Sequence, residues 1–147
     1  HALSNAAKRS VDVRLLLPGP VSDHPWISQA ARRYYRRLLR NGVKIFEYQP
    51  RFLHAKIILA DDWISIGSSN LDLWNQFWNL DANQAAKDEK LIQQAHQFFE
   101  TDFRQSILIT HSIWKQRPWS QRFSEWRASY VVRMILWLVY LASRMQK

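Results

Sequence analysis

His54 and Lys56 are two chemically active side chains that stand two residues apart in the stretch FLHAKIILA, residues 52–60. The alternation of apolar residues in this stretch predicts a β-strand, and side chains two residues apart on a strand project from the same face. A lysine ammonium binds phosphate oxygens and an imidazole titrates near neutral pH. The pair could therefore hold a phosphodiester and either attack its phosphorus or protonate its leaving oxygen. A half-exposed strand edge with solvated polar side chains would show the same pattern.

A second group of polar residues follows in the sequence GSSN, which ends the next apolar run. Gly67 permits a close backbone approach, and Ser68 and Asn70 carry hydrogen-bond donors suited to phosphate oxygens. Asp81 lies eleven residues beyond Asn70 in an otherwise apolar segment. Its carboxylate could orient an imidazole and fix its tautomer, or it could serve only as a turn or cap residue.

The chain must place these residues on secondary-structure elements, and its apolar periodicity predicts which segments those are. Residues 52–60 and 63–67 are expected to be strands joined by a turn at Asp61 and Asp62, because aspartate readily bonds its own backbone in turns. The other elements expected are helices over residues 1–9, 26–40 and 87–106, strands over 11–20 and 43–48, and an extended segment over 77–84. Helices that alternate with strands predict an α/β layered fold.

The helix expected over residues 26–40 has both an apolar stripe and a signal for its C-terminal end. Gly42 stands where a helix C-cap belongs. One apolar stripe at helical spacing is expected to face the core, and its members are Ile27, Ala30, Ala31, Tyr34, Tyr35, Leu38 and Leu39.

Residues 113–147 differ in composition from the rest of the chain, because tryptophans are interleaved with arginines and lysines and Glu125 is the one acid among them. Within this tail the run VVRMILWLVYLA is shorter than the roughly 18 apolar residues that a bilayer span requires. Such a segment is typical of an amphipathic element in an anionic lipid interface, or of a C-terminal helix packed on the core. We therefore expect a lobe over residues 1–112 and a basic, Trp-rich interfacial tail over 113–147.

Composition narrows the classes of function further. The 147 residues are 47% hydrophobic, which is enough for one ordinary core. The absence of cysteine excludes a disulfide framework, a thiolate metal site and a cysteine nucleophile. A formal charge of +9 favours an anionic partner, which could be a nucleic acid, a phosphate-bearing substrate or an anionic lipid surface. Because the chain starts at His1, inside a segment that already has helical character, we expect it to be a fragment of a longer protein.

Taken together, HAKIILAD, GSSN and NLDANQ resemble the HKD signature of the phospholipase D superfamily, which is H-x-K-x4-D followed by G-S-x-N and a downstream acid. The resemblance covers about residues 1–105, and within the superfamily the likeness is closest to the C-terminal half of bacterial cardiolipin synthases. It implies a layered α/β/α lobe with a mixed sheet between helices, truncated here at its N-terminus, followed by a basic aromatic C-terminal helix.

The resemblance also implies a role for each residue of the motif. The implied roles are catalytic histidine for His54, phosphate ligand for Lys56, Ser68 and Asn70, histidine-orienting carboxylate for Asp81, and a mainly structural role for Asp61, the aspartate of the motif. Two departures from the family pattern stand out. The spacer between Asp61 and Gly67 is one residue shorter than usual, and Asp81 stands where the family usually has glutamate.

A complete site of this kind uses two histidines, and this chain has one H-x-K motif. The resemblance implies that the second comes from another half of the same chain or from a second subunit, and that no metal or cofactor takes part. The implied reaction is phosphatidyl transfer through a phosphohistidine, which forms cardiolipin from phosphatidylglycerol-type lipids. The expected partners are anionic phospholipids and the cytoplasmic face of a bacterial inner membrane, to which the protein binds peripherally; the 147 residues alone are expected to be inactive.

Two other functions stay open at this stage. The first is a homodimeric phosphodiesterase or nuclease, in which arginines of residues 32–40 grip phosphates, although those arginines could equally form a solvated helix face. The second is a non-catalytic membrane-binding module that retains the motif. The basic, Trp-rich tail argues against nucleic acid as the partner.

Overall fold

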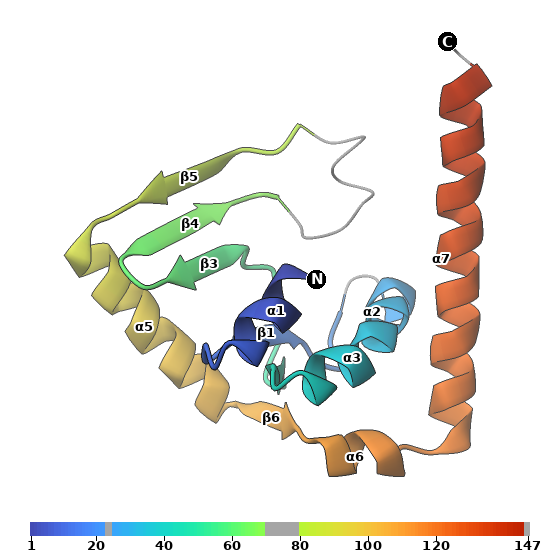
Figure 1. Ribbon diagram of the computed structural model, residues 1–147, viewed down its shortest axis with the longest axis horizontal. Helices are drawn as coiled ribbons and strands as arrows, with labels where there is room; N and C mark the ends of the chain where they lie inside the picture. The colour runs from blue at the N-terminus through green and yellow to red at the C-terminus, as the bar shows by residue number, and fades with distance from the viewer. Residues whose placement is uncertain (23–24, 70–79, 146–147) are drawn as a thin grey trace. The chain divides into compact units, whose positions relative to one another are not determined.

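The structure is a computed structural model that describes residues 1–22, 25–69 and 80–145 (Figure 1). The chain divides into two compact units. One comprises His1–Leu53 and Gln105–Lys147, and the other comprises His54–Arg104. The candidate residues at positions 54 to 81 fall in the second unit, so its sheet determines how the site is built.

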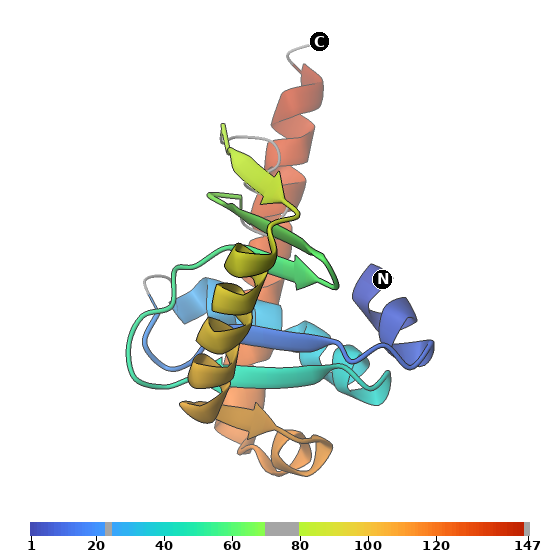
Figure 2. The same cartoon turned by 90° about the vertical axis from the view of Figure 1, so that its left-hand side faces the viewer.

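The first unit is a small mixed sheet with helices. Its elements are α1 (Ala2–Lys8), β1 (Arg14–Pro18), α2 (Pro25–Ala31), the 3₁₀ turn η1 (Arg32–Tyr34), α3 (Tyr35–Arg40), β2 (Lys44–Tyr48), β6 (Ser106–Ile109), α6 (His111–Gln116) and α7 (Trp119–Met145). The strand order is β1-β2-β6, with β1 parallel to β2 and β6 antiparallel to it. Figure 2 shows β1 in blue beside β2 in teal. The expected α/β class, mixed sheet and C-terminal aromatic helix are confirmed.

The core of this unit gathers around β2. Its buried residues are Tyr35, Val43, Ile45, Ile109 and Trp114. Val43 and Ile45 stand two residues apart and are both buried, as expected when one face of a strand packs inward. The rings of Tyr35 and Trp114 contact each other with centroids 5.2 Å apart, which ties α3 to α6. Trp114, which was assigned to the tail, is therefore part of this core.

The helix predicted over residues 26–40 is interrupted by η1. A 3₁₀ turn has three residues per turn, so it rotates the following residues relative to an α-helix. Tyr35, which follows this turn, is buried, whereas Ile27, Ala31 and Tyr34 of the predicted stripe are exposed. The prediction that all seven stripe residues face the core is wrong at these three positions.

Gly42 ends α3 as the sequence predicts. Its φ of 88° lies in the left-handed region that favours glycine. The N–H of Gly42 donates to the carbonyl of Leu39 at 3.1 Å, and that of Val43 donates to the carbonyl of Leu38 at 3.1 Å. These two bonds are those of a Schellman cap, which satisfies the last carbonyls of the helix and redirects the chain into β2.

The second unit is an antiparallel sheet with one helix. Its elements are β3 (Ile57–Ala60), β4 (Trp63–Gly67), β5 (Asn83–Ala86) and α5 (Glu89–Arg104), with strand order β3-β4-β5. The register pairs Ala60 with Trp63 at the turn and Ile57 with Ile66 at the other end. The predicted hairpin and helix are confirmed. Within the extended segment expected over 77–84, residues 77–79 lie outside the described part, and β5 begins at Asn83.

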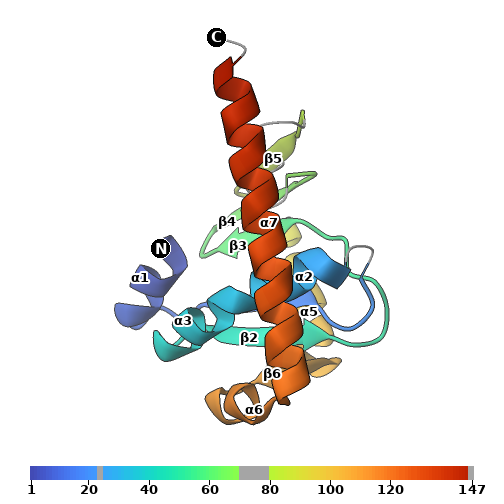
Figure 3. The same cartoon turned by 90° about the vertical axis from the view of Figure 1, so that its right-hand side faces the viewer.

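The long helix α7 runs beside α2 in the first unit (Figure 3). Over the described residues, no helix combines the length and apolarity needed to cross a bilayer. Within its unit α7 packs on α2 and η1.

Candidate active site at one end of the second sheet

His54 and Lys56 precede β3 instead of lying on it, because the strand begins at Ile57. The prediction that a strand extends over residues 52–60 and holds both side chains on one face is therefore wrong. The partner strand β4 ends at Gly67, so the ladder has its last bond there: the N–H of Gly67 donates to the carbonyl of Lys56 at 3.2 Å. A strand cannot extend beyond its hydrogen-bonding partner.

That last bond brings the two parts of the motif together. Ile57 pairs with Ile66 and Gly67 pairs with Asn83, so the segments before β3, after β4 and before β5 all meet at one end of the sheet. The N–H of Ser68 continues this end of the ladder by donating to the carbonyl of Ala82 at 3.0 Å. The sheet thus gathers Lys56, Ser68 and Asp81 although they are far apart in sequence.

Ser68 and Asp81 contact each other directly. The Ser68 hydroxyl donates to Oδ1 of Asp81 at 3.0 Å and accepts a bond from the N–H of Ala82 at 3.0 Å. Ser69 is held in the same way, because its N–H donates to Oδ1 of Asn83 at 3.3 Å. The Ser68–Asp81 bond was not anticipated from the sequence, which assigned the hydroxyl to a phosphate and the carboxylate to an imidazole; those two roles stay predictions.

The lysine of the motif bends back toward its own segment. Lys56 Nζ donates to the backbone carbonyl of His54 at 2.9 Å, and the Lys56 side chain is only partly exposed. His54, Ser68 and Asp81 are exposed. Asn70, the remaining predicted phosphate ligand, lies outside the described residues. The exposed end of the sheet therefore offers an ammonium, an imidazole and a hydroxyl, which are groups suited to binding and reacting with a phosphodiester.

Asp61 lies at the opposite end of the hairpin from these groups. It occupies the turn between β3 and β4 with a φ of 50°, a conformation that aspartate tolerates better than most residues. The length of β3 separates it from Lys56, so a phosphate bound at the open end would not reach it. Next to it, Asp62 accepts a bond from Lys87 Nζ at 2.9 Å, which lowers the pKa of the Asp62 carboxyl. These positions agree with a structural role for the motif's aspartate.

Gly67 is required by the close approach of β5. A Cβ at this position would lie 2.6 Å from the Cα of Asn83 and would also collide with the Ala82 carbonyl. We expect Gly67→Ala to destabilise the protein by about 1–3 kcal/mol, the usual cost of overpacking, and to open the end of the sheet that holds Lys56 and Ser68. Chemical denaturation would measure the loss. Gly42→Ala is the comparison, because a Cβ there meets nothing within 4 Å and only its positive φ is strained; equal costs for the two variants would contradict the steric argument.

Sequence reasoning missed a charged cluster in the first unit. Arg32 Nη1 contacts Oε1 of Glu47 at 2.8 Å, Arg32 Nε contacts Oε1 of Glu125 at 3.2 Å, and Arg117 Nε contacts Oε2 of Glu125 at 3.0 Å. Both glutamates are buried. The possibility that Arg32 grips a phosphate or sits on a solvated face is therefore corrected, because its guanidinium is held by two carboxylates. The sequence signals were a glutamate inside an apolar strand and a single acid in a basic tail.

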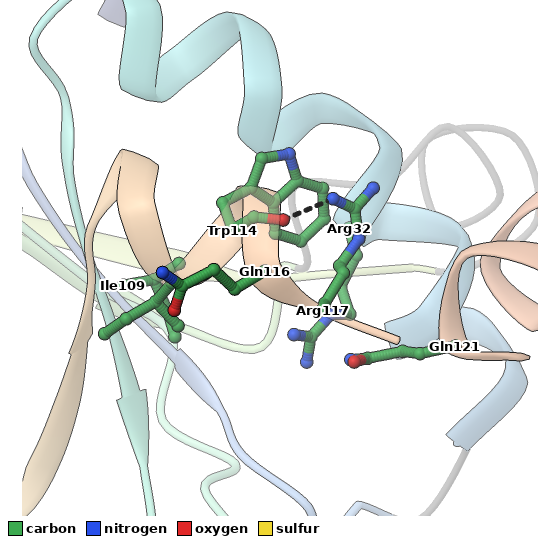
Figure 4. Close-up of a pocket in the computed structure, with 7 residues that line it drawn as sticks. Arg32, Ile109, Trp114, Gln116, Arg117 and Gln121 are labelled. Carbon is green, nitrogen blue, oxygen red and sulfur yellow. Dashed lines mark hydrogen bonds between the residues drawn. The ribbon is translucent and has the colours of Figure 1, made fainter. Parts of the chain in front are cut away.

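A cavity of about 310 Å³ adjoins this cluster and is lined by Arg32, Ile109, Ile113, Trp114, Gln116, Arg117 and Gln121. In Figure 4 the two arginines lie against the indole of Trp114, and Arg117 donates to the backbone carbonyl of Trp114. The Cζ atom of Arg117 is 3.5 Å from the ring centroid, a cation–π contact. Because the arginines already pair with carboxylates, the charged cluster serves to hold α6 and α7 in place. None of the motif residues lines the cavity.

Several known proteins are similar to this chain over most of its length. The family described as "Cardiolipin synthase, PLD-like domain" matches residues 1–103. Among curated proteins, cardiolipin synthase 1 of Staphylococcus epidermidis is 39% identical over 132 residues, which cover 89% of this chain and 27% of that protein. The minor cardiolipin synthase ClsB of Bacillus subtilis is 37% identical over 127 residues, covering 86% of this chain and 32% of that protein.

Cardiolipin synthase B of Escherichia coli is 43% identical over 94 residues, covering 63% of this chain and 22% of that protein. The chain thus spans about a quarter to a third of the length of the curated relatives it matches. The two longer matches exceed 103 residues, so they extend beyond the PLD-like region into the C-terminal part. No solved structure matches the chain. The chain belongs to the family of PLD-like domains of cardiolipin synthases.

Proposed function

We propose that this chain supplies one half of a phosphatidyl-transfer site and that, with a second H-x-K half, it forms cardiolipin from phosphatidylglycerol-type lipids. The observation that carries the proposal is the bond from the Gly67 N–H to the Lys56 carbonyl, since it places the HAK and GSS parts of the motif at one end of a sheet. The family match and the names of the relatives support the choice of cardiolipin synthesis.

The reaction requires two groups with different tasks. One imidazole attacks phosphorus of a phosphatidylglycerol, and the bond from phosphorus to the glycerol oxygen breaks. A second group protonates that oxygen and glycerol leaves. The same group then removes the proton from the hydroxyl of a second phosphatidylglycerol, whose oxygen displaces the histidine from phosphorus. His54 supplies one of these two groups, and the other comes from the second half, either in the same chain or in a second subunit.

The other motif residues hold the phosphate while this happens. Lys56 is proposed to turn its ammonium from the His54 carbonyl toward a phosphate oxygen, where it offsets the charge that accumulates in the transition state. Ser68 and Asn70 are proposed to donate to the remaining oxygens, and Asp81 to orient the imidazole of His54. Histidine and lysine suffice for these steps, so the proposal includes no metal or cofactor.

The substrate places the reaction at a membrane. We propose that the protein acts peripherally at the cytoplasmic face of a bacterial inner membrane, on anionic phospholipid. Nucleic acid is not an expected substrate.

The decisive test is a transfer assay with phosphatidylglycerol and purified protein. We expect cardiolipin and released glycerol from a protein that carries both halves of the site, and neither product from the 147-residue chain alone. Hydrolysis of DNA without cardiolipin formation would replace the proposal with the phosphodiesterase alternative.

Lys56→Ala in the protein with both halves is expected to lose most of its turnover, about 10²–10³-fold, because the phosphate loses its charge partner in the transition state. Stability should change little, since the Lys56 ammonium donates to a backbone carbonyl of its own segment. Lys87→Ala is the matched control: it removes a lysine from the same unit, one that is paired with Asp62 away from the site. A large fall in thermal midpoint for Lys56→Ala, or equal activity of the two variants, would contradict the assigned role.

A further inference from the structure

Helix α7 has two faces with different surroundings, and the inner one packs on α2 and η1. Ser124 Oγ donates to Oε1 of Gln29 at 2.7 Å, and Ser129 Oγ donates to the carbonyl of Ala30 at 3.4 Å. Glu125, between them, is buried in the ion pairs with Arg32 and Arg117. In the first turns of α7 this face therefore has polar and charged partners inside the unit.

The outer face carries an aromatic stripe, which we define as Trp119, Phe123, Trp126, Tyr130 and Trp137. At about 100° per residue these five positions fall within one narrow band of the helix, on the side opposite Ser124 and Glu125. Their side chains are 74%, 43%, 62%, 62% and 59% exposed in that order. The first four rings stack in sequence, with centroid distances of 5.4, 6.0 and 6.1 Å.

Exposed arginines flank the aromatic stripe on both sides. Arg122 and Arg133 lie along one edge and Arg127 along the other, and the Cζ atom of Arg127 is 5.8 Å from the Phe123 ring centroid. Glu125 is the one acid of α7, and it is buried on the opposite face. The described outer face is thus aromatic along its centre and cationic along its edges.

We propose that the aromatic stripe of α7 and its flanking arginines bind the surface of an anionic phospholipid bilayer, with the helix lying in the plane of the interface. Tryptophan and tyrosine rings favour the boundary between headgroups and acyl chains. Arginines at the edges of the stripe can reach phosphate groups while their stems cover apolar surface. A neutral protein partner would use the rings but not the charges, whereas an anionic lipid surface uses both.

This inference extends the proposed function, because it names the surface that would hold the enzyme at its lipid substrate. It is independent of catalysis, since vesicle binding is measured without turnover. A protein that bound vesicles through α7 but transferred no phosphatidyl group would refute the proposed function and leave the inference intact.

The experiment uses the protein with both halves of the site and sedimentation with vesicles of phosphatidylglycerol and phosphatidylcholine. Trp126→Ser is expected to weaken binding roughly tenfold, because one interfacial anchor is lost. Phe98→Ser is the matched control, since Phe98 is a ring of comparable exposure, 54%, on α5. It should bind vesicles as the unaltered protein does.

The contribution of the arginines to vesicle binding is tested by a second variant with its own matched control. Arg122→Gln with Arg127→Gln removes two cations beside the aromatic stripe and is expected to weaken binding to the anionic vesicles roughly tenfold to thirtyfold. The same loss of charge through Arg36→Gln with Arg40→Gln, two exposed arginines of α3, should have little effect. Vesicles of phosphatidylcholine alone should bind both double variants equally weakly.

Two results would overturn the inference. One is unchanged vesicle binding by Trp126→Ser and by the double variant of α7. The other is a fall of several degrees in the thermal midpoint of Trp126→Ser together with unchanged binding by Arg122→Gln and Arg127→Gln, because it would mean that another part of the protein covers the aromatic stripe.

Discussion

Replacing His54 with alanine in the protein that carries both halves of the site is expected to lower phosphatidyl transfer by at least about 10³-fold, because one of the two groups that move the phosphatidyl unit is removed. The residue lies on an exposed segment just before β3, so the fold should be retained. The measurement is the initial rate of cardiolipin formation from phosphatidylglycerol, with far-ultraviolet circular dichroism to check that the structure is intact.

His96→Ala is the control for this experiment. His96 is exposed on α5 in the same unit and no lysine follows it at the motif's spacing, so its removal should leave the rate unchanged. If His54→Ala retained a rate within about tenfold of the unaltered protein, general acid–base or nucleophilic catalysis by this residue would be excluded. The non-catalytic membrane-binding module would then become the better description.

Rapid quenching with phosphatidylglycerol labelled in its phosphatidyl group separates the two tasks that His54 could have. If His54 is the nucleophile, the unaltered protein carries the label on it and the alanine variant carries none. If His54 is the acid and base, the label lies on the histidine of the second half in both proteins, and in the variant it forms and leaves more slowly because both steps lose their proton transfer. Absence of label from the unaltered protein under all quench conditions would contradict a covalent phosphohistidine.

Local sequence signals predicted the hairpin and the cap because each depends on neighbouring residues. The two aspartates at 61 and 62 marked the turn, and Gly42 marked the end of α3, since a positive φ is needed at each turn of this kind. The start of β3 could not be predicted in this way. Apolar alternation continues back to Leu53, but the strand begins at Ile57 because its partner ends at Gly67. The length of a strand depends on pairing, which alternation does not report.

In the candidate site, too, the local features could be predicted from the sequence and those that depend on strand pairing could not. The residue types and their spacing predicted His54, Lys56, Ser68 and Asp81 as site residues, and the sheet brings the segments that carry the last three to one end. The bond between Ser68 and Asp81 was beyond the sequence, because it depends on the register of β4 against β5. Strand β6 was also missed, since its four residues directly follow the long helix α5 and carry no turn signal of their own.

The tail illustrates why a compositional prediction needs the packing. From its composition, a basic, Trp-rich segment could bind a lipid interface or pack on the core. In α7 one face does the packing, because Glu125 is buried against Arg32 and Arg117, while Trp126 on the other face is exposed. Deleting the whole tail would therefore remove packing and the outer surface together. Single substitutions on one face at a time are the informative experiments.

Glu125→Ala is expected to destabilise the protein by about 3–5 kcal/mol, because it removes a buried carboxylate that pairs with two arginines and leaves their charges without it. The Glu125 side chain is 5% exposed, and those of Arg32 and Arg117 are about one-fifth exposed, so water cannot fully replace the lost partner. Burial also raises the pKa of the Tyr35 hydroxyl, so Glu47 is the second carboxylate beside Arg32 and Tyr35 adds no negative charge there. Denaturation with urea would measure the loss.

Asp12→Ala is the control for Glu125→Ala, since Asp12 forms an exposed ion pair with Lys44 and Arg14 that should contribute less than about 1 kcal/mol. The hydrogen bond from Lys44, followed by that from Arg14, lowers the pKa of Asp12, so its small contribution is present at neutral pH and is lost as the pH falls through the lowered pKa. Both variants should therefore be compared at pH 7.

Hydrogen exchange would locate the effect of Glu125→Ala within the fold. Because Glu125 joins α7 to η1 and to the segment after α6, amides of α2 and of the first turns of α7 should exchange faster, while those of β3 and β4 keep their rates. Faster exchange confined to the end of α7, or a stability loss no larger than that of Asp12→Ala, would mean that the cluster does not hold the helix. The aromatic stripe would then lack the fixed outward orientation on which its proposed binding to lipid depends.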